Sequence, residues 1–150
     1  MKDTVQHAEA QDRMAPGKLT AGGFLGEDER PVALIVEEDE ASFRRAGIDP
    51  ETAAAELGRL RDEGSRGLGE PVTVDGTWLV SSGDARGKLP CPYEDGIFHK
   101  NSIWVRRIAG GETIVFSDLS LHLLAEHHFC QGKGSPFRLE PAVLARLLAK

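Results

Sequence analysis

The sequence contains few cysteines and no long hydrophobic run. Its 150 residues include two cysteines, Cys91 and Cys130, which is too few for the disulfide framework of a small secreted protein. No stretch of about eighteen consecutive apolar residues occurs, as a membrane-spanning helix would require. The polar, acidic N-terminus lacks the apolar segment of a secretory signal. We therefore expect a cytoplasmic protein without membrane contact, whose cysteines are thiols or metal ligands.

Familiar catalytic signatures are also missing. The segment HLLAEHH matches neither the HExxH nor the HxxEH pattern of zinc proteases, and GKGSPFR is not a phosphate-binding GxxxxGK[ST] loop. No internal repeat occurs. The composition, with 40% apolar and 28% charged residues, is ordinary for one globular domain.

The residues that are present predict an α+β fold. We expect residues 1–17 to be a disordered leader, because large apolar side chains are scarce there. Residues 18–150 are expected to form a single α+β domain with a His/Cys-rich C-terminal half. Apolar residues at helical spacing predict helices over 31–46 and 50–63, and a glycine ends each of them.

The rest of the domain is predicted to be a sheet followed by helices. Alternating residues on both sides of Asp75-Gly76 predict a tight hairpin, and a second hairpin is expected within 97–118 after a loop over 83–96. Two further helices are predicted over about 119–128 and 141–149. The expected order is two N-terminal helices, an antiparallel four- to five-stranded meander, and two C-terminal helices.

Charge is distributed unevenly along the chain. Residues 1–85 carry nine Lys and Arg against eighteen Asp and Glu, a net charge of −9, whereas residues 86–150 carry nine against six, a net charge of +3. The overall charge of −6 argues against general nucleic-acid binding. The basic C-terminal half is where we expect an anionic ligand or a protein partner to bind.

The C-terminal half also contains most residues that can ligate a transition metal. Six of the seven histidines and cysteines fall between positions 91 and 130. Zinc accepts cysteine sulfur and histidine nitrogen together, and histidines a few residues apart on a helix are typical zinc ligands. The sequence therefore predicts one zinc ion with a structural role in an interaction module. The predicted ligands are Cys91, His99, His122 and His127.

Helix geometry leaves an alternative ligand set open. His122 and His127 are about 140° apart around an ideal helix, whereas His122 and Glu126 share a face. Glu126 can therefore replace His127 as the fourth ligand. The histidines can also be hydrogen-bonded core residues without a metal, because the surrounding helix is apolar nearly all round.

Two other functions are compatible with the sequence. A metal-dependent hydrolase would use Glu126 or His128 as its catalytic base, with Lys133 and Arg138 holding an anionic substrate. A nucleic-acid-binding module would use Trp104 and the basic side chains around it.

Overall fold

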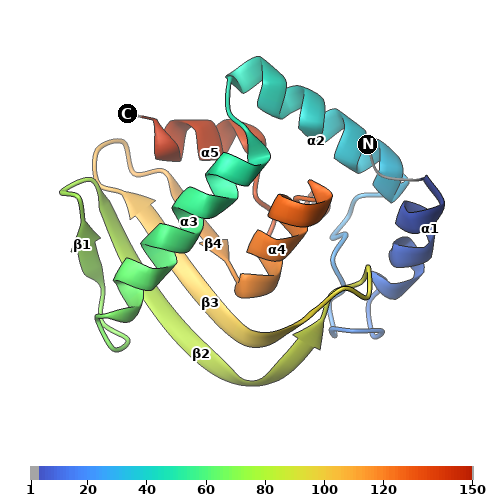
Figure 1. Ribbon diagram of the computed structural model, residues 1–150, viewed down its shortest axis with the longest axis horizontal. Helices are drawn as coiled ribbons and strands as arrows, with labels where there is room; N and C mark the ends of the chain where they lie inside the picture. The colour runs from blue at the N-terminus through green and yellow to red at the C-terminus, as the bar shows by residue number, and fades with distance from the viewer. Residues whose placement is uncertain (1–3, 150) are drawn as a thin grey trace.

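The computed structural model describes residues 4–149, which form an α+β fold of five helices and one four-stranded antiparallel sheet (Figure 1). The helices are α1 (Thr4–Arg13), α2 (Val32–Ala46), α3 (Pro50–Ser65), α4 (Asp118–His127) and α5 (Pro141–Leu148). The strands are β1 (Val72–Val74), β2 (Trp78–Pro90), β3 (Ile97–Arg107) and β4 (Thr113–Phe116). Their spatial order, β1-β2-β3-β4, confirms the predicted meander.

Helix α1 lies in the segment that the sequence predicts to be a disordered leader, so there are three N-terminal helices instead of two. Residues 1–3 of that expected leader lie outside the described residues. The buried face of α1 and the turn after it consists of His7, Ala10 and Met14. These residues follow helical spacing, but only Met14 is a large apolar side chain, so the hydrophobic pattern is too weak to predict a helix.

Helices α2 and α3 form where the sequence predicts them. The α3 helix begins at Pro50 because Asp49 accepts a hydrogen bond from the backbone N–H of Thr52 at 2.9 Å. The α2 helix ends at Gly47, which adopts the left-handed conformation with φ of 71°. Both helices present an apolar stripe to the interior.

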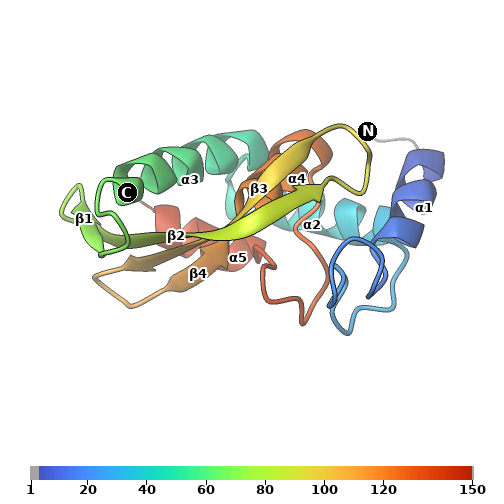
Figure 2. The same cartoon turned by 90° about the horizontal axis from the view of Figure 1, so that it is seen from below.

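The hairpin between β2 and β3 is much longer than predicted. Residues 83–90, expected to be a loop, continue β2 as an irregular strand whose pairing with β3 shifts between Asp84 and Lys88. This β-bulge follows from the glycine-rich segment GDARGK, which lacks the alternation that marks a regular strand. The hairpin sweeps beneath α3 and α4 and twists along its length, so its tip lies beside α1 (Figure 2).

Helices α3 and α4 lie on the same face of the sheet, and two apolar clusters result (Figure 1). The first, called here the sheet core, joins α3, α4 and α5 to the sheet; its fully buried members include Leu57, Leu60, Val80, Ile103, Phe116, Leu124 and Leu144. The second, called here the N-terminal core, joins α1 and α2 to α4 and the hairpin tip; it comprises Ala10, Met14, Phe24, Val32, Ile35, Val36, Cys91, Leu119, Leu123 and Phe129. Helix α4 contributes to both.

Candidate metal centre

The tip of the β2–β3 hairpin places Cys91 and Asp95 close together. Pro90 and Ile97 form the last strand pair, and the backbone N–H of Cys91 donates to the carbonyl of Gly96 at 2.9 Å. The N–H of Glu94 donates back to the Cys91 carbonyl at 2.8 Å. Residues 91–96 therefore form a tight turn that fixes the direction of both side chains.

Helix α4 supplies two histidines opposite this turn. Its start is fixed by Ser117, which accepts a hydrogen bond from the backbone N–H of Ser120, and by Asn101 of β3, which accepts one from Asp118. Because β3 begins directly after the hairpin tip, this contact sets the position of α4 relative to the turn. His122 and His127 both reach the carboxylate of Asp95 as a result.

One potential ligand atom from each of Cys91, Asp95, His122 and His127 lies within 4.8 Å of all the others. His122 Nε2 is 2.8 Å from Asp95 Oδ1, and His127 Nε2 is 2.7 Å from Asp95 Oδ2. Bond lengths in tetrahedral zinc sites put neighbouring ligand atoms about 3.3 to 3.6 Å apart. An ion would therefore fit after shifts of about 1 Å, which side-chain rotations provide.

Burial and charge affect the two ligands of the turn in opposite directions. Burial and a hydrogen bond with Asp95 raise the pKa of the Cys91 thiol to about 12. Burial also acts to raise the pKa of Asp95, but hydrogen bonds from Cys91 and His122 and the charge of His127 outweigh it and lower that pKa to about 2. Without a metal ion the thiol stays protonated at neutral pH, which argues against Cys91 as a nucleophile.

Aromatic rings enclose the histidines. The Tyr93 ring stacks on His127 with a centroid distance of 3.9 Å, and Phe98 packs against His122 at 4.6 Å. His127 is buried, with 6% of its side chain exposed, whereas Asp95 has 40% exposed. The cluster therefore has a largely apolar wall, with solvent access on the Asp95 side.

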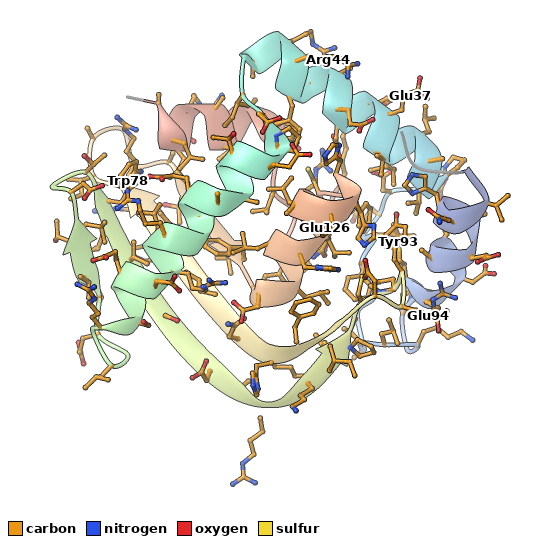
Figure 3. The ribbon with its side chains drawn as sticks, in the orientation of Figure 1. Glu37, Arg44, Trp78, Tyr93, Glu94 and Glu126 are labelled. Carbon is orange, nitrogen blue, oxygen red and sulfur yellow. The ribbon has the colours of Figure 1, made fainter. Side chains whose placement is uncertain are left out.

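Helix α1 contacts the same turn. The hydroxyl group of Tyr93 lies 2.7 Å from His7 Nδ1. Arg13 donates to the carbonyl of Pro92 and forms an ion pair with Glu94 at 3.1 Å. Figure 3 shows Tyr93 at the hairpin tip, between α4 and α1. The turn that carries two potential ligands is thus held by α4 on one side and by α1 on the other.

Three of the four predicted metal ligands meet in this cluster, and His99 does not. His99 is exposed on β3 and pairs with Lys88, whereas Cys91 lies opposite Gly96. The reason is the register of the hairpin. Because the turn closes tightly over residues 91–96, a residue eight positions after Cys91 lies well down the next strand, and Asp95 takes the predicted place of His99.

The predicted catalytic residues lie outside the cluster. Glu126 is exposed on α4 and contributes no ligand atom to it (Figure 3). His128 lies at the left-handed C-terminal end of α4, with Nδ1 2.6 Å from Glu40 and Nε2 2.6 Å from Glu51. Burial lowers the pKa of His128, but these hydrogen bonds outweigh burial and raise it. His128 therefore links α4 to α2 and α3.

Of the two predicted anion-binding residues, Arg138 has internal partners for its side chain, whereas Lys133, within the described part of the chain, is bound only through its backbone. Arg138 makes two hydrogen bonds with Asp39, at 2.8 and 2.9 Å, and both side chains are almost fully buried. Arg138 also pairs with Glu140 at 2.8 Å. The exposed Lys133 uses its backbone N–H to bind Asp28 at 3.1 Å. Arg138 thus connects α2 to the segment before α5 and offers little of its guanidinium to a ligand.

Sequence reasoning missed Asp95, Tyr93 and His7 as parts of this region. The available signal was the segment CPYEDG, in which two carboxylates follow a proline-flanked cysteine within one turn. The one carboxylate among the predicted ligand sets was Glu126, which its helical spacing from His122 suggested, whereas no such spacing pointed to Asp95. His7 carried no signal, because no local pattern indicates that α1 packs on the hairpin tip.

Comparisons with known proteins do not identify a relative. No protein family model, curated protein or solved structure matches the chain significantly. None of the described helices combines the length and apolarity that spanning a membrane requires.

Proposed function

We propose that this chain is a small zinc-binding protein, in which one ion bound by Cys91, Asp95, His122 and His127 has a structural role within an interaction module. The observation that supports this proposal is the convergence of four different potential ligands, from a hairpin turn and a helix, within 4.8 Å. Exposed acidic residues gather without a metal in many proteins, but a buried thiol and a buried imidazole in the same cluster are less common.

The donor set favours zinc. Magnesium and calcium prefer oxygen ligands, whereas a site with one sulfur, two nitrogens and one oxygen suits zinc. The carboxylate of Asp95 is an accepted fourth zinc ligand. Zinc binding would also deprotonate Cys91, since the thiolate is the form that binds the ion.

The position of the cluster favours a structural role. Four protein ligands complete a tetrahedral site and leave no position for a substrate. An ion there would connect the hairpin tip to α4, and Tyr93 and Arg13 would extend this connection to α1. Ile97, which is 69% exposed beside the turn, provides an apolar contact for a protein partner.

Metal analysis of the purified protein tests this proposal. We expect one zinc ion per chain, retained on dialysis. With Co²⁺ in its place, the visible absorption of a tetrahedral site should appear, together with a thiolate-to-metal band that Cys91→Ser removes. His127→Gln should weaken zinc binding by 10-fold or more, whereas the matched variant His99→Gln should bind zinc like the wild type.

Two results would overturn the proposal. One is zinc that is sub-stoichiometric and lost on dialysis. The other is an equal loss of affinity in His99→Gln and His127→Gln. In either case the cluster is a hydrogen-bonded histidine pair organised by Asp95.

A cleft beside His122 favours a metal-dependent hydrolase as the second candidate. This cleft, of about 740 Å³, lies between α3 and α4 and is lined by His122 and Arg61. If the exposed Asp95 left the ion, a water molecule could replace it and the cleft could admit a substrate. Chelation would then abolish hydrolysis of a phosphate or carboxylate ester without unfolding the protein, whereas chelation of a structural ion would destabilise the fold.

A further inference from the structure

A second cavity is separate from the cleft beside His122: the two share no lining residue, and none of the four cluster residues lines the second one. Its volume is about 600 Å³, within the range of roughly 300 to 1,000 Å³ that is typical of small-molecule sites. Five segments of the chain form its wall: the N-terminal arm around Phe24, the bulged part of β2, the facing part of β3, the start of α4, and the loop before α5.

The interior of this cavity is apolar. Leu89 and Phe137, both partly exposed, provide accessible apolar surface. Phe24 and Leu119 also line the cavity, but they are packed into the N-terminal core and are only 4% and 2% exposed. Binding of a hydrocarbon or aromatic group that displaces water from such a lining is favourable in free energy.

The lining of the cavity contains one cation and one acid, Lys100 on β3 and Asp84 on β2. The bulge beside the cavity carries two further exposed cations, Arg86 and Lys88. Among the ion pairs of the described residues, none involves these three cations. The lining itself is neutral, but with Arg86 and Lys88 the bulge and the facing residues of β3 carry a net charge of +2, and in a chain of net charge −6 this favours an anion near the cavity.

The β-bulge positions one of these cations at the cavity. Lys100 lines the cavity, and its side-chain carbons lie over Gly87, where a Cβ atom would be 3.7 Å from Lys100 Cδ. Gly87 has a φ of 100°, a conformation that favours glycine. The irregular segment of β2 thus makes room for the lysine stem, and His99 lies beside it in the lining.

We propose that this cavity binds a small amphiphilic monoanion, with its hydrocarbon or aromatic body against Leu89 and Phe137 and its anionic head group at Lys100. A single head charge fits better than a polyanion, because Asp84 also lines the cavity and repels additional negative charge. This ligand site is separate from the proposed zinc site.

Calorimetric titration of the full chain with three probes tests the proposal. Dodecanoate has both an apolar chain and an anionic head group, dodecanol has only the chain, and acetate has only the head group. We expect dodecanoate to bind at one site, with at least about tenfold higher affinity than either partial probe, since charge-assisted pairing and apolar burial each contribute.

Two variants locate the binding. Gly83 lines the cavity, has no left-handed φ, and a Cβ atom there would meet no atom within 4 Å. Gly83→Phe should therefore fill the space without straining the backbone and weaken dodecanoate binding at least about tenfold. Lys100→Gln should weaken dodecanoate about tenfold and leave dodecanol unchanged.

Two matched control variants test whether the loss of dodecanoate binding is specific to the cavity. Thr73→Phe adds the same ring to an exposed position of β1, and Arg44→Gln removes a cation from an exposed position of α2. Both variants should bind dodecanoate like the wild type.

Three results would overturn the proposal: no dodecanoate binding, equal binding of dodecanol and dodecanoate in the wild type, or unchanged binding of dodecanoate in Gly83→Phe. Competition with oligonucleotides of increasing length gives a further test. If longer, more highly charged oligonucleotides displaced dodecanoate progressively better, the basic residues would form a surface for polyanions, and the proposal would be wrong.

Discussion

The sheet core and the N-terminal core are stabilised by different interactions. The sheet core is built from large aliphatic and aromatic side chains on regular helices and strands, and Gly64 lets α3 approach Val80 closely. The N-terminal core is smaller and is surrounded by polar contacts that join irregular segments, such as Tyr93 with His7 and Asp28 with Lys133. One region therefore depends on apolar burial, and the other depends largely on specific hydrogen bonds and, in our proposal, on an ion.

The chain contains probes for both regions. Its single tyrosine, Tyr93, lies against the N-terminal core, and both tryptophans, Trp78 and Trp104, lie in the sheet. Unfolding of each region can therefore be followed separately in the same sample.

The largest effect should come from truncation in the sheet core. Phe116 is fully buried and pairs with Ile103. Phe116→Ala should lower the free energy of unfolding by about 3 to 5 kcal/mol, through lost burial and the cavity that remains. Urea unfolding followed by tryptophan fluorescence measures this loss. If the loss were under about 1 kcal/mol, the sheet core would not be the main source of stability.

Zinc should have the next largest effect, in the other region. At a free concentration about 100 times the dissociation constant, the ion should add about 2.7 kcal/mol to the free energy of unfolding. The measurement is thermal unfolding with zinc and with a chelator, in the wild type and in Cys91→Ser. We expect the wild type alone to respond strongly. An identical response in both proteins would place zinc elsewhere.

Asp28 provides a test that depends on pH. Hydrogen bonds from Arg30 hold the pKa of Asp28 well below its usual 3.8, although burial opposes this, and the Asp28 side chain is 3% exposed. Asp28→Asn should cost about 1 to 3 kcal/mol at pH 7, because Arg30 loses its charged partner.

The sign of the pH dependence follows from the lowered pKa of Asp28. The ionised carboxylate stabilises the folded state in full above the pKa of the unfolded chain, and this contribution disappears as pH falls through the lower pKa of the folded state. The stability difference between wild type and Asp28→Asn should therefore be constant from pH 7 to about 5 and shrink below pH 4. Urea unfolding across this range measures it. A difference that grows on acidification would contradict the assignment.

The smallest expected effect is at the contact between α1 and the hairpin tip. Tyr93→Phe keeps the ring on His127 but removes the hydroxyl group bound to His7. We expect a loss of about 0.5 to 1.5 kcal/mol, which shows mainly as faster hydrogen exchange of the α1 amides. Exchange in α3 serves as the internal control. Equal acceleration in both helices would mean that α1 does not open separately.

The same difference between regions explains what the sequence could predict. Helices α2 and α3 and the first hairpin follow from apolar periodicity, from Asp49 as the cap, and from the turn pair Asp75-Gly76. These signals are local, so they can be read without knowing the fold. Helix α1 could not be predicted, because its buried face is stabilised by contacts with residues far away in the chain.

The candidate site was predicted only in part for a similar reason. Cys91, His122 and His127 are residue types with recognisable metal chemistry, and the structure brings them together. Choosing between His99 and Asp95 required the register of the β2–β3 hairpin, which depends on the length of its turn. The length of the turn could not be read from the sequence, because the glycine-rich part of β2 has the composition of a loop.

If zinc binds as proposed, the order of the cluster residues along the chain has a consequence for unfolding kinetics. Cys91 and Asp95 precede β3 and β4, and His122 and His127 follow them. An ion held from both sides closes a loop around these two strands, which reduces the entropy of the denatured chain in the way that a covalent cross-link does. In the proposed zinc-bound state, β3 could separate completely from α4 only after one pair of ligands released the ion, so the lifetime of the native state would depend on the rate of that release.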